Sequence, residues 1–101
     1  MKVVWTETAV AHLDSIYEFI AKTSPLYAHL IVRRLWDRTG QIEAFPESGR
    51  TMPEYHQPNV REVLEPPYRI IYRVHEQRLE ILAVVHARRA GPGLEGEGRA
   101  T

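Results

Sequence analysis

The sequence has no cysteine, and only two of its thirteen basic residues are lysines. Without cysteine there is no disulfide framework, no thiolate metal site and no cysteine nucleophile, which fits a reducing compartment. No stretch is apolar over the roughly 18 or more residues that a membrane-spanning helix requires. Glu7 interrupts the apolar N-terminal residues early, so we expect no signal peptide and place the chain in the cytoplasm.

The charges balance, with 13 Lys and Arg residues against 13 Asp and Glu residues. A protein that grips nucleic acid by its phosphates usually has a basic excess, so any such contact here must use a local patch. The five histidines lack the spacing of metal ligands, and no glycine loop suits a phosphate. We therefore expect neither a metal nor a cofactor.

Two amphipathic helices follow a short N-terminal strand at residues 2–5. Thr6 suits a helix N-cap, and helical spacing of apolar residues continues to about Thr23. Ser24-Pro25 signals the start of a second helix. This helix runs to about Phe45, because Pro46 cannot continue it. The two helices therefore form an antiparallel hairpin. Their apolar stripes are Ala9, Leu13, Ile16 and Ile20 in the first, and Ala28, Val32, Leu35, Thr39 and Ile42 in the second.

Three strands are predicted in the second half, at 60–65, 68–75 and 78–86, after a loop or short strand with turns at 46–59. The gaps between them are short, which favours antiparallel neighbours. The last two strands are apolar on both faces, so we expect helices on one side of the sheet and partial cover on the other.

The element order is therefore β-α-α-β-β-β. It predicts an α+β fold in which the helical hairpin packs on a small, antiparallel-dominated sheet. One domain spans residues 1–90, because 101 residues suffice for a single compact core. Residues 91–101 contain four of the six glycines and no packing pattern, so we expect a disordered tail.

Four segments together resemble one protein family: WTETAVAHLDSIYEFIA, FPESGRTMPE, NVREVLEPPYRIIYRV and EILAVVHARR. In this order and spacing they resemble the RelE/ParE toxins of bacterial toxin–antitoxin pairs, over the first ninety residues. The resemblance implies the fold just described. It also implies a cognate antitoxin that neutralises the chain in a hetero-oligomer. Trp5, Trp36 and the five tyrosines mostly suit packing, and one or two of them are candidate antitoxin anchors, because aromatic residues dominate interface hot spots.

The family divides by mechanism. RelE-like members cleave mRNA on the ribosome, whereas ParE-like members poison DNA gyrase. RNA cleavage requires a base, cations for the charged phosphorane and an acid. Glu47 is a candidate base, Arg61 and Arg69 are candidate phosphate contacts, and His86 is a candidate acid.

Each of these side chains also has a structural alternative. The Glu47 carboxylate can cap a turn or stay solvated, and His86 can form a structural hydrogen bond at the end of its strand. The two arginines can pair with Glu62, Glu65 or a loop carboxylate.

We favour the ParE-like branch. The chain has no basic excess, no lysine follows Lys22, and the run from His86 to Arg89 is similar to ParE-like chains. Arg50, Arg88 and Arg89 are then candidate contacts for gyrase or its DNA, although they can equally be solvated arginines. A third possibility is an inactive relic that only binds an antitoxin.

Overall fold

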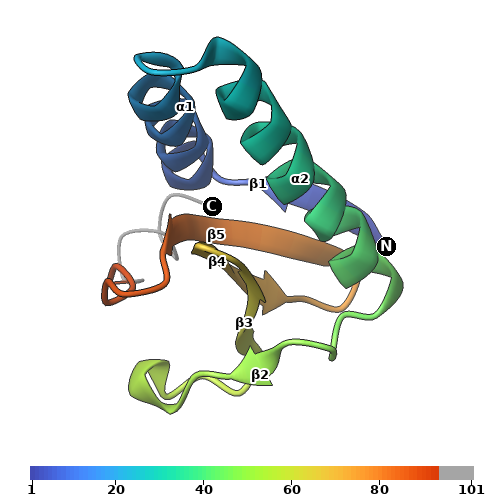
Figure 1. Ribbon diagram of the computed structural model, residues 1–101. Coiled ribbons are helices and arrows are strands. Elements are labelled where there is room, and N and C mark those ends of the chain that lie inside the picture. The colour runs from blue at the N-terminus through green and yellow to red at the C-terminus, as the bar shows by residue number, and fades with distance from the viewer. Residues whose placement is uncertain (94–101) are drawn as a thin grey trace.

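The computed structural model describes residues 1–93, so the expected disorder of the tail from residue 94 onward falls outside the described residues. The helices and strands follow one another in the predicted order, with one short additional strand, β2, before the last three (Figure 1). The elements are β1 (Lys2–Trp5), α1 (Glu7–Ala21), α2 (Pro25–Ala44), β2 (Arg50–Thr51), the 3-10 turn η1 (Pro53–Tyr55), β3 (Val60–Glu65), β4 (Tyr68–Val74) and β5 (Arg78–His86).

Both helices begin at the expected caps. The Thr6 hydroxyl accepts the Ala9 N–H at 3.1 Å and donates to the Ile81 carbonyl at 2.8 Å, so this cap also ties α1 to the sheet. The Ser24 hydroxyl accepts the Tyr27 N–H at 3.1 Å, and proline occupies the first turn of α2. The N-terminal half of the chain therefore folds as its local sequence signals predict.

The sheet is mixed, with strand order β1-β5-β4-β3-β2. Strand β1 pairs parallel to β5, and the other neighbours are antiparallel. Ala83 lies opposite Ile71 and Ile81 lies opposite Tyr72, which leaves Leu82 as an extra residue in β5. This β-bulge turns Leu82 and Ala83 to the same face of the sheet.

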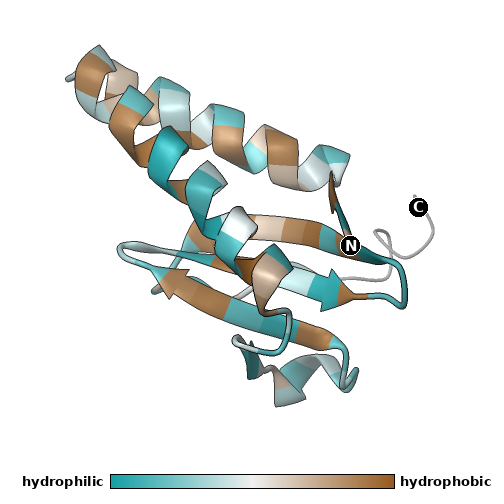
Figure 2. Cartoon of the chain, turned by 90° about the vertical axis from the view of Figure 1, so that its right-hand side faces the viewer, coloured by the Kyte–Doolittle hydropathy of each residue, from teal (hydrophilic) through white to brown (hydrophobic). Residues whose placement is uncertain are grey.

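Both faces of the sheet are covered, as the strand pattern predicted. The hairpin of α1 and α2 lies over one face (Figure 2) and encloses the larger core, which includes Leu35 and Tyr72. A smaller cluster on the other face is formed by Met52, Val60, Ile71, Leu82 and Ala83, with Tyr55 packed against it. The loop between α2 and β3 thus serves as cover for the second face.

Candidate functional site

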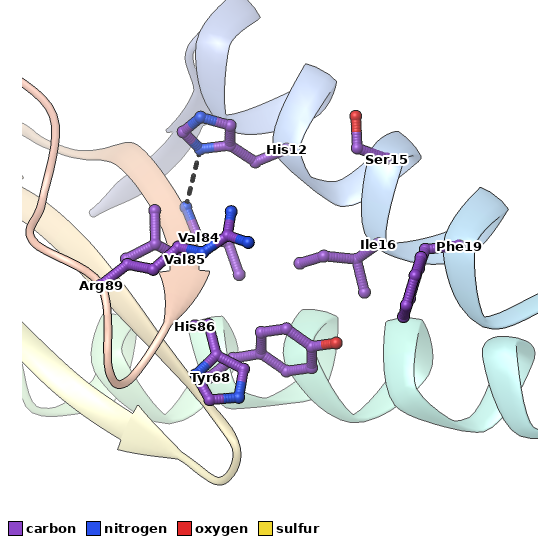
Figure 3. A pocket seen from close by; sticks show the side chains of 9 residues that line it. All are labelled: His12, Ser15, Ile16, Phe19, Tyr68, Val84, Val85, His86 and Arg89. Carbon is purple, nitrogen blue, oxygen red and sulfur yellow. Dashed lines mark hydrogen bonds between the residues drawn. The ribbon is translucent and has the colours of Figure 1, made fainter.

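A groove of about 460 Å³ opens where α1 meets the end of β5 (Figure 3). Phe19 on its rim is 72% exposed, although it is a large apolar side chain. The groove therefore combines an apolar surface with imidazole and guanidinium groups. It is lined by His12, Ser15, Ile16, Phe19, Tyr68, Val84, Val85, His86 and Arg89.

Hydrogen bonds orient both histidines of this groove. His12 Nδ1 accepts the Val84 N–H at 3.2 Å, drawn as the dashed line in Figure 3, and His86 Nδ1 accepts the Arg88 N–H at 3.2 Å. A ring whose Nδ1 accepts carries its proton on Nε2 in the neutral form. Together with the Arg89 guanidinium, the His86 ring suits groups that accept hydrogen bonds, such as carboxylates and phosphates.

Residues 87–92, which we call the C-terminal strap, leave β5 and are anchored to the sheet. The Ala87 N–H donates to the Pro67 carbonyl at 2.9 Å, Arg69 donates to the Arg89 carbonyl, and the Tyr55 hydroxyl donates to the Pro92 carbonyl at 2.7 Å. Gly91 and Pro92, which the sequence analysis assigned to the tail, are half-buried. The strap thus holds Arg88 and Arg89 at the end of β5.

Arg69 and Arg50 share a buried carboxylate. Arg69 is 8% exposed and its Nη1 lies 2.9 Å from Glu62 Oε1, while Arg50 pairs with the other oxygen of Glu62. Pairing of Arg69 with Glu62, one of the alternatives drawn from the sequence, is confirmed. The Arg50 side chain stays 77% exposed and can still meet an external anion.

A second buried carboxylate was not identified from the sequence. Glu80 Oε1 lies 3.2 Å from Arg73 Nη1 and 2.9 Å from His75 Nε2, and Arg73 also donates to Gln57 at 3.1 Å. The sequence does indicate that this face carries buried charges, because Arg69 and Arg73 are four residues apart in one strand and therefore point to the same side of the sheet. Both networks lie on the sheet face that the helices do not cover.

The four candidates for RNA cleavage do not converge on one site. Arg61 donates to the main-chain carbonyls of Gly49 at 2.8 Å and Glu47 at 3.3 Å, so it holds the loop that carries Glu47. In the register Arg61 lies opposite Tyr72, whereas His86 lies opposite Tyr68. These two positions are four steps apart along β4, or about 13 Å of strand.

Arg69 lies on the other face of the sheet from His86. Tyr68 and His86 are directly opposite each other and share the helix-covered side, so the next residue, Arg69, points to the opposite side. The structure therefore brings Glu47 and Arg61 together through main-chain contacts. It brings His86 together with Arg89 in the groove, whereas Arg69 reaches only the main-chain carbonyl of Arg89 and points away from the His86 ring.

No cluster of three or more potential metal ligands occurs among residues 1–93. Within the same range, none of the helices combines the length and hydrophobicity of a membrane span.

Burial raises the pKa of the Tyr72 hydroxyl above its ordinary value of 10.0, and the hydrogen bond from the Gly49 N–H acts in the opposite direction. The unfolded chain therefore ionises at lower pH than the folded chain. Stability contributed by the neutral phenol is complete below pH 10.0 and falls as the pH rises above it. Denaturant unfolding from neutral to alkaline pH will show this decline, and Tyr72→Phe is expected to make it shallower. An unchanged slope in that variant would contradict the assignment.

Comparison with known proteins agrees with the fold and covers nearly the whole chain. Residues 3–91 match the family model described as ParE toxin of type II toxin-antitoxin system, parDE. Toxin RelE2 of Caulobacter vibrioides is 36% identical over 89 residues, covering 87% of this chain and 97% of that protein. Putative toxin Y4kP of Sinorhizobium fredii is 32% identical over 93 residues, covering 90% and 93%.

Two solved structures share the architecture. The chromosomal ParDE TA system from P. aeruginosa superposes with a TM-score of 0.71 at 27% identity, over 85% of this chain and 95% of that chain. The YoeB/ParE toxin from Agrobacterium tumefaciens superposes with a TM-score of 0.58 at 22% identity, over 85% of this chain and 98% of that chain. This likeness supports the fold alone. The family match, the two curated relatives and the first of these structures agree. The chain therefore belongs to the RelE/ParE family of toxins of type II toxin–antitoxin systems.

Proposed function

We propose that this toxin inhibits DNA gyrase, blocks replication in the cytoplasm, and is neutralised by a cognate antitoxin in a hetero-oligomer. The observation that carries the proposal is the anchored C-terminal strap, which holds two exposed arginines beside the groove at the end of β5. A fixed backbone lowers the entropy that a contact must overcome, so anchored arginines bind better than mobile ones.

The charge distribution supports a local contact with a polyanion. The whole chain is neutral, yet Arg88 and Arg89 are exposed and adjacent, and Arg89 lies among the imidazoles of the groove. Gyrase works on DNA, whose phosphates attract such a patch. Arg50 supplies another exposed guanidinium, on the sheet face that carries Glu62.

RelE-like cleavage of mRNA has less support from the geometry. A nuclease must place its base, acid and phosphate contacts around one scissile bond. Here two donors of Arg69 are engaged by Glu62 and by the Arg89 carbonyl, and the guanidinium is nearly buried. His86 and Arg61 lie at different positions along the sheet. Inhibition of gyrase requires a binding surface and no such convergence.

A supercoiling assay with purified gyrase and the full chain tests the proposal. Reversing both charges, in the variant R88E/R89E, is expected to weaken inhibition by roughly 10- to 100-fold, because two phosphate contacts become repulsive. The matched control is R78E, which reverses an exposed charge at the other end of β5. Retained antitoxin binding will show that the double variant is folded.

Two outcomes of this assay would contradict the proposal. Wild-type chain that leaves supercoiling unchanged would remove gyrase as the target. Equal inhibition by wild type and R88E/R89E would remove the strap as the contact surface.

A further inference from the structure

A second hollow, of about 280 Å³, lies between α2 and β1, and we call it the tryptophan notch. Its wall is a stacked pair, in which the rings of Trp5 and Trp36 have centroids 5.5 Å apart and planes inclined by 12°. Trp5 packs against the core, whereas Trp36 is 55% exposed. The notch is lined by Val3, Trp5, Trp36, Asp37, Thr39, Gly40 and Glu43.

The exposed indole is held in place before any partner arrives. Stacking on Trp5 restricts the Trp36 ring, so little side-chain entropy is lost when a ligand covers it. Gly40 faces open space, because a Cβ placed there would meet nothing within 4 Å. A rigid, accessible tryptophan beside an open floor has the character of an interface anchor.

The electrostatics of the notch favour a cation. Glu43 stands in the last turn of α2, which has no basic residue to offset the negative end of the helix dipole. Asp37 lies 3.3 Å from Arg33 on the helix surface, and for Glu43 the described part of the chain provides no ion pair within 4 Å. A polyanion such as DNA is repelled here, whereas a positively charged side chain is attracted.

The notch also borders a free strand edge. Strand β1 ends the sheet, and the only strand of the described region that pairs with it is β5. Its other edge leaves backbone donors and acceptors available for an extended chain. The combination of an open edge, an indole face and carboxylates fits a basic, extended protein segment.

We propose that the tryptophan notch binds an arginine on an extended segment of the antitoxin. The proposal rests on the part of the proposed function in which an antitoxin neutralises this toxin, and it is independent of gyrase. Arginine fits better than lysine, because a planar guanidinium stacks on the Trp36 ring while its N–H groups reach Asp37 or Glu43. The notch thereby contributes to antitoxin affinity without using the basic strap.

The test measures binding of the cognate antitoxin to the full chain and its variants by calorimetry. Trp36→Ala and Glu43→Lys are each expected to raise the Kd by roughly 10- to 100-fold, as substitutions of anchor residues do. Trp36→Phe keeps an aromatic face and is expected to recover part of the affinity. Glu18→Lys, an exposed charge reversal on α1, is the matched control and should bind as wild type does.

Thermal unfolding separates binding from folding. Glu43→Lys places a cation at the C-terminus of α2, so the variant should fold at least as stably as wild type while it binds more weakly. Raising the salt concentration should reduce the effect of Glu43→Lys more than that of Trp36→Ala.

Three results would overturn the proposal: unchanged antitoxin affinity in both notch variants, an equal loss in Glu18→Lys, or wild-type chain that the antitoxin does not bind. Loss of gyrase inhibition with unchanged antitoxin binding would assign the notch to the target instead. A chain that leaves gyrase unaffected but loses antitoxin affinity in the notch variants would refute the gyrase proposal and support this one.

Discussion

Replacing Glu62 with alanine is expected to destabilise the fold by about 3–5 kcal/mol, the cost of leaving one member of a buried ion pair alone. The Glu62 side chain is 1% exposed and that of Arg69 is 10% exposed, so the guanidinium would lose its counterion in a place that water barely reaches. Arg50 is largely solvated and contributes little to this cost. Urea unfolding monitored by circular dichroism measures the change.

Two controls accompany this prediction. Glu65→Ala removes a more exposed carboxylate, which lies 3.9 Å from Arg34 and 3.7 Å from Arg38, and should cost under about 1 kcal/mol. The double variant E62M/R69M removes both charges together, so most of the stability should return. An E62A protein as stable as wild type would show that Arg69 does not depend on this carboxylate.

Gly49→Ala is the second change with a large expected effect, a loss of about 1–3 kcal/mol through overpacking. A Cβ at Gly49 would lie 2.5 Å from the Tyr72 hydroxyl and 2.6 Å from the Glu62 carbonyl oxygen. The same hydroxyl accepts the Gly49 N–H at 3.0 Å and donates to the Pro46 carbonyl at 2.7 Å. The added methyl group therefore displaces the contacts that hold the loop after α2.

The matched control for Gly49 is Gly40→Ala. Gly40 lies inside α2 with nothing within 4 Å of an added Cβ, so alanine should stabilise the helix by about 1 kcal/mol. The two glycine variants should thus shift the midpoint of urea unfolding in opposite directions. If Gly49→Ala also raised stability, the close approach of Tyr72 to the loop would be refuted.

The elements that the sequence predicted correctly depend on local signals. Thr6 and the Ser24-Pro25 pair start their helices through hydrogen bonds to residues three positions ahead. The three long strands follow from short runs rich in apolar residues and from the short turns between them. Their pairing order could then be inferred, because consecutive strands usually lie side by side.

The strap and the groove depend on contacts between residues far apart in the sequence, which local patterns do not contain. Gly91 and Pro92 resemble a tail by composition, and the hydrogen bond from Tyr55, 37 residues before Pro92, shows that they pack on the domain. His12 is one of the five histidines whose spacing excluded a metal site, and the sequence alone does not indicate what it contacts. Its hydrogen bond to Val84, 72 residues away, places it beside His86 and Arg89.

For the candidate site residues too, only some of the contacts could be predicted from the sequence. Pairing of Arg69 with Glu62 could be proposed from neighbouring strands, and the structure confirms it. Whether Glu47, Arg61, Arg69 and His86 share a site could not be inferred, since that depends on the strand register and on the face to which each side chain points. The contact roles of Arg50, Arg88 and Arg89 stay proposals that the supercoiling assay addresses.

The most direct test of the central claim follows macromolecular synthesis in cells induced to express this chain without its antitoxin. Incorporation of labelled thymidine and of labelled methionine is measured separately over time. A gyrase inhibitor stops thymidine incorporation first while methionine incorporation continues, and the R88E/R89E variant should lose this effect. If methionine incorporation stops first, translation is the target and the gyrase proposal is contradicted. If both continue and the cells grow normally, the chain acts only as an antitoxin-binding relic.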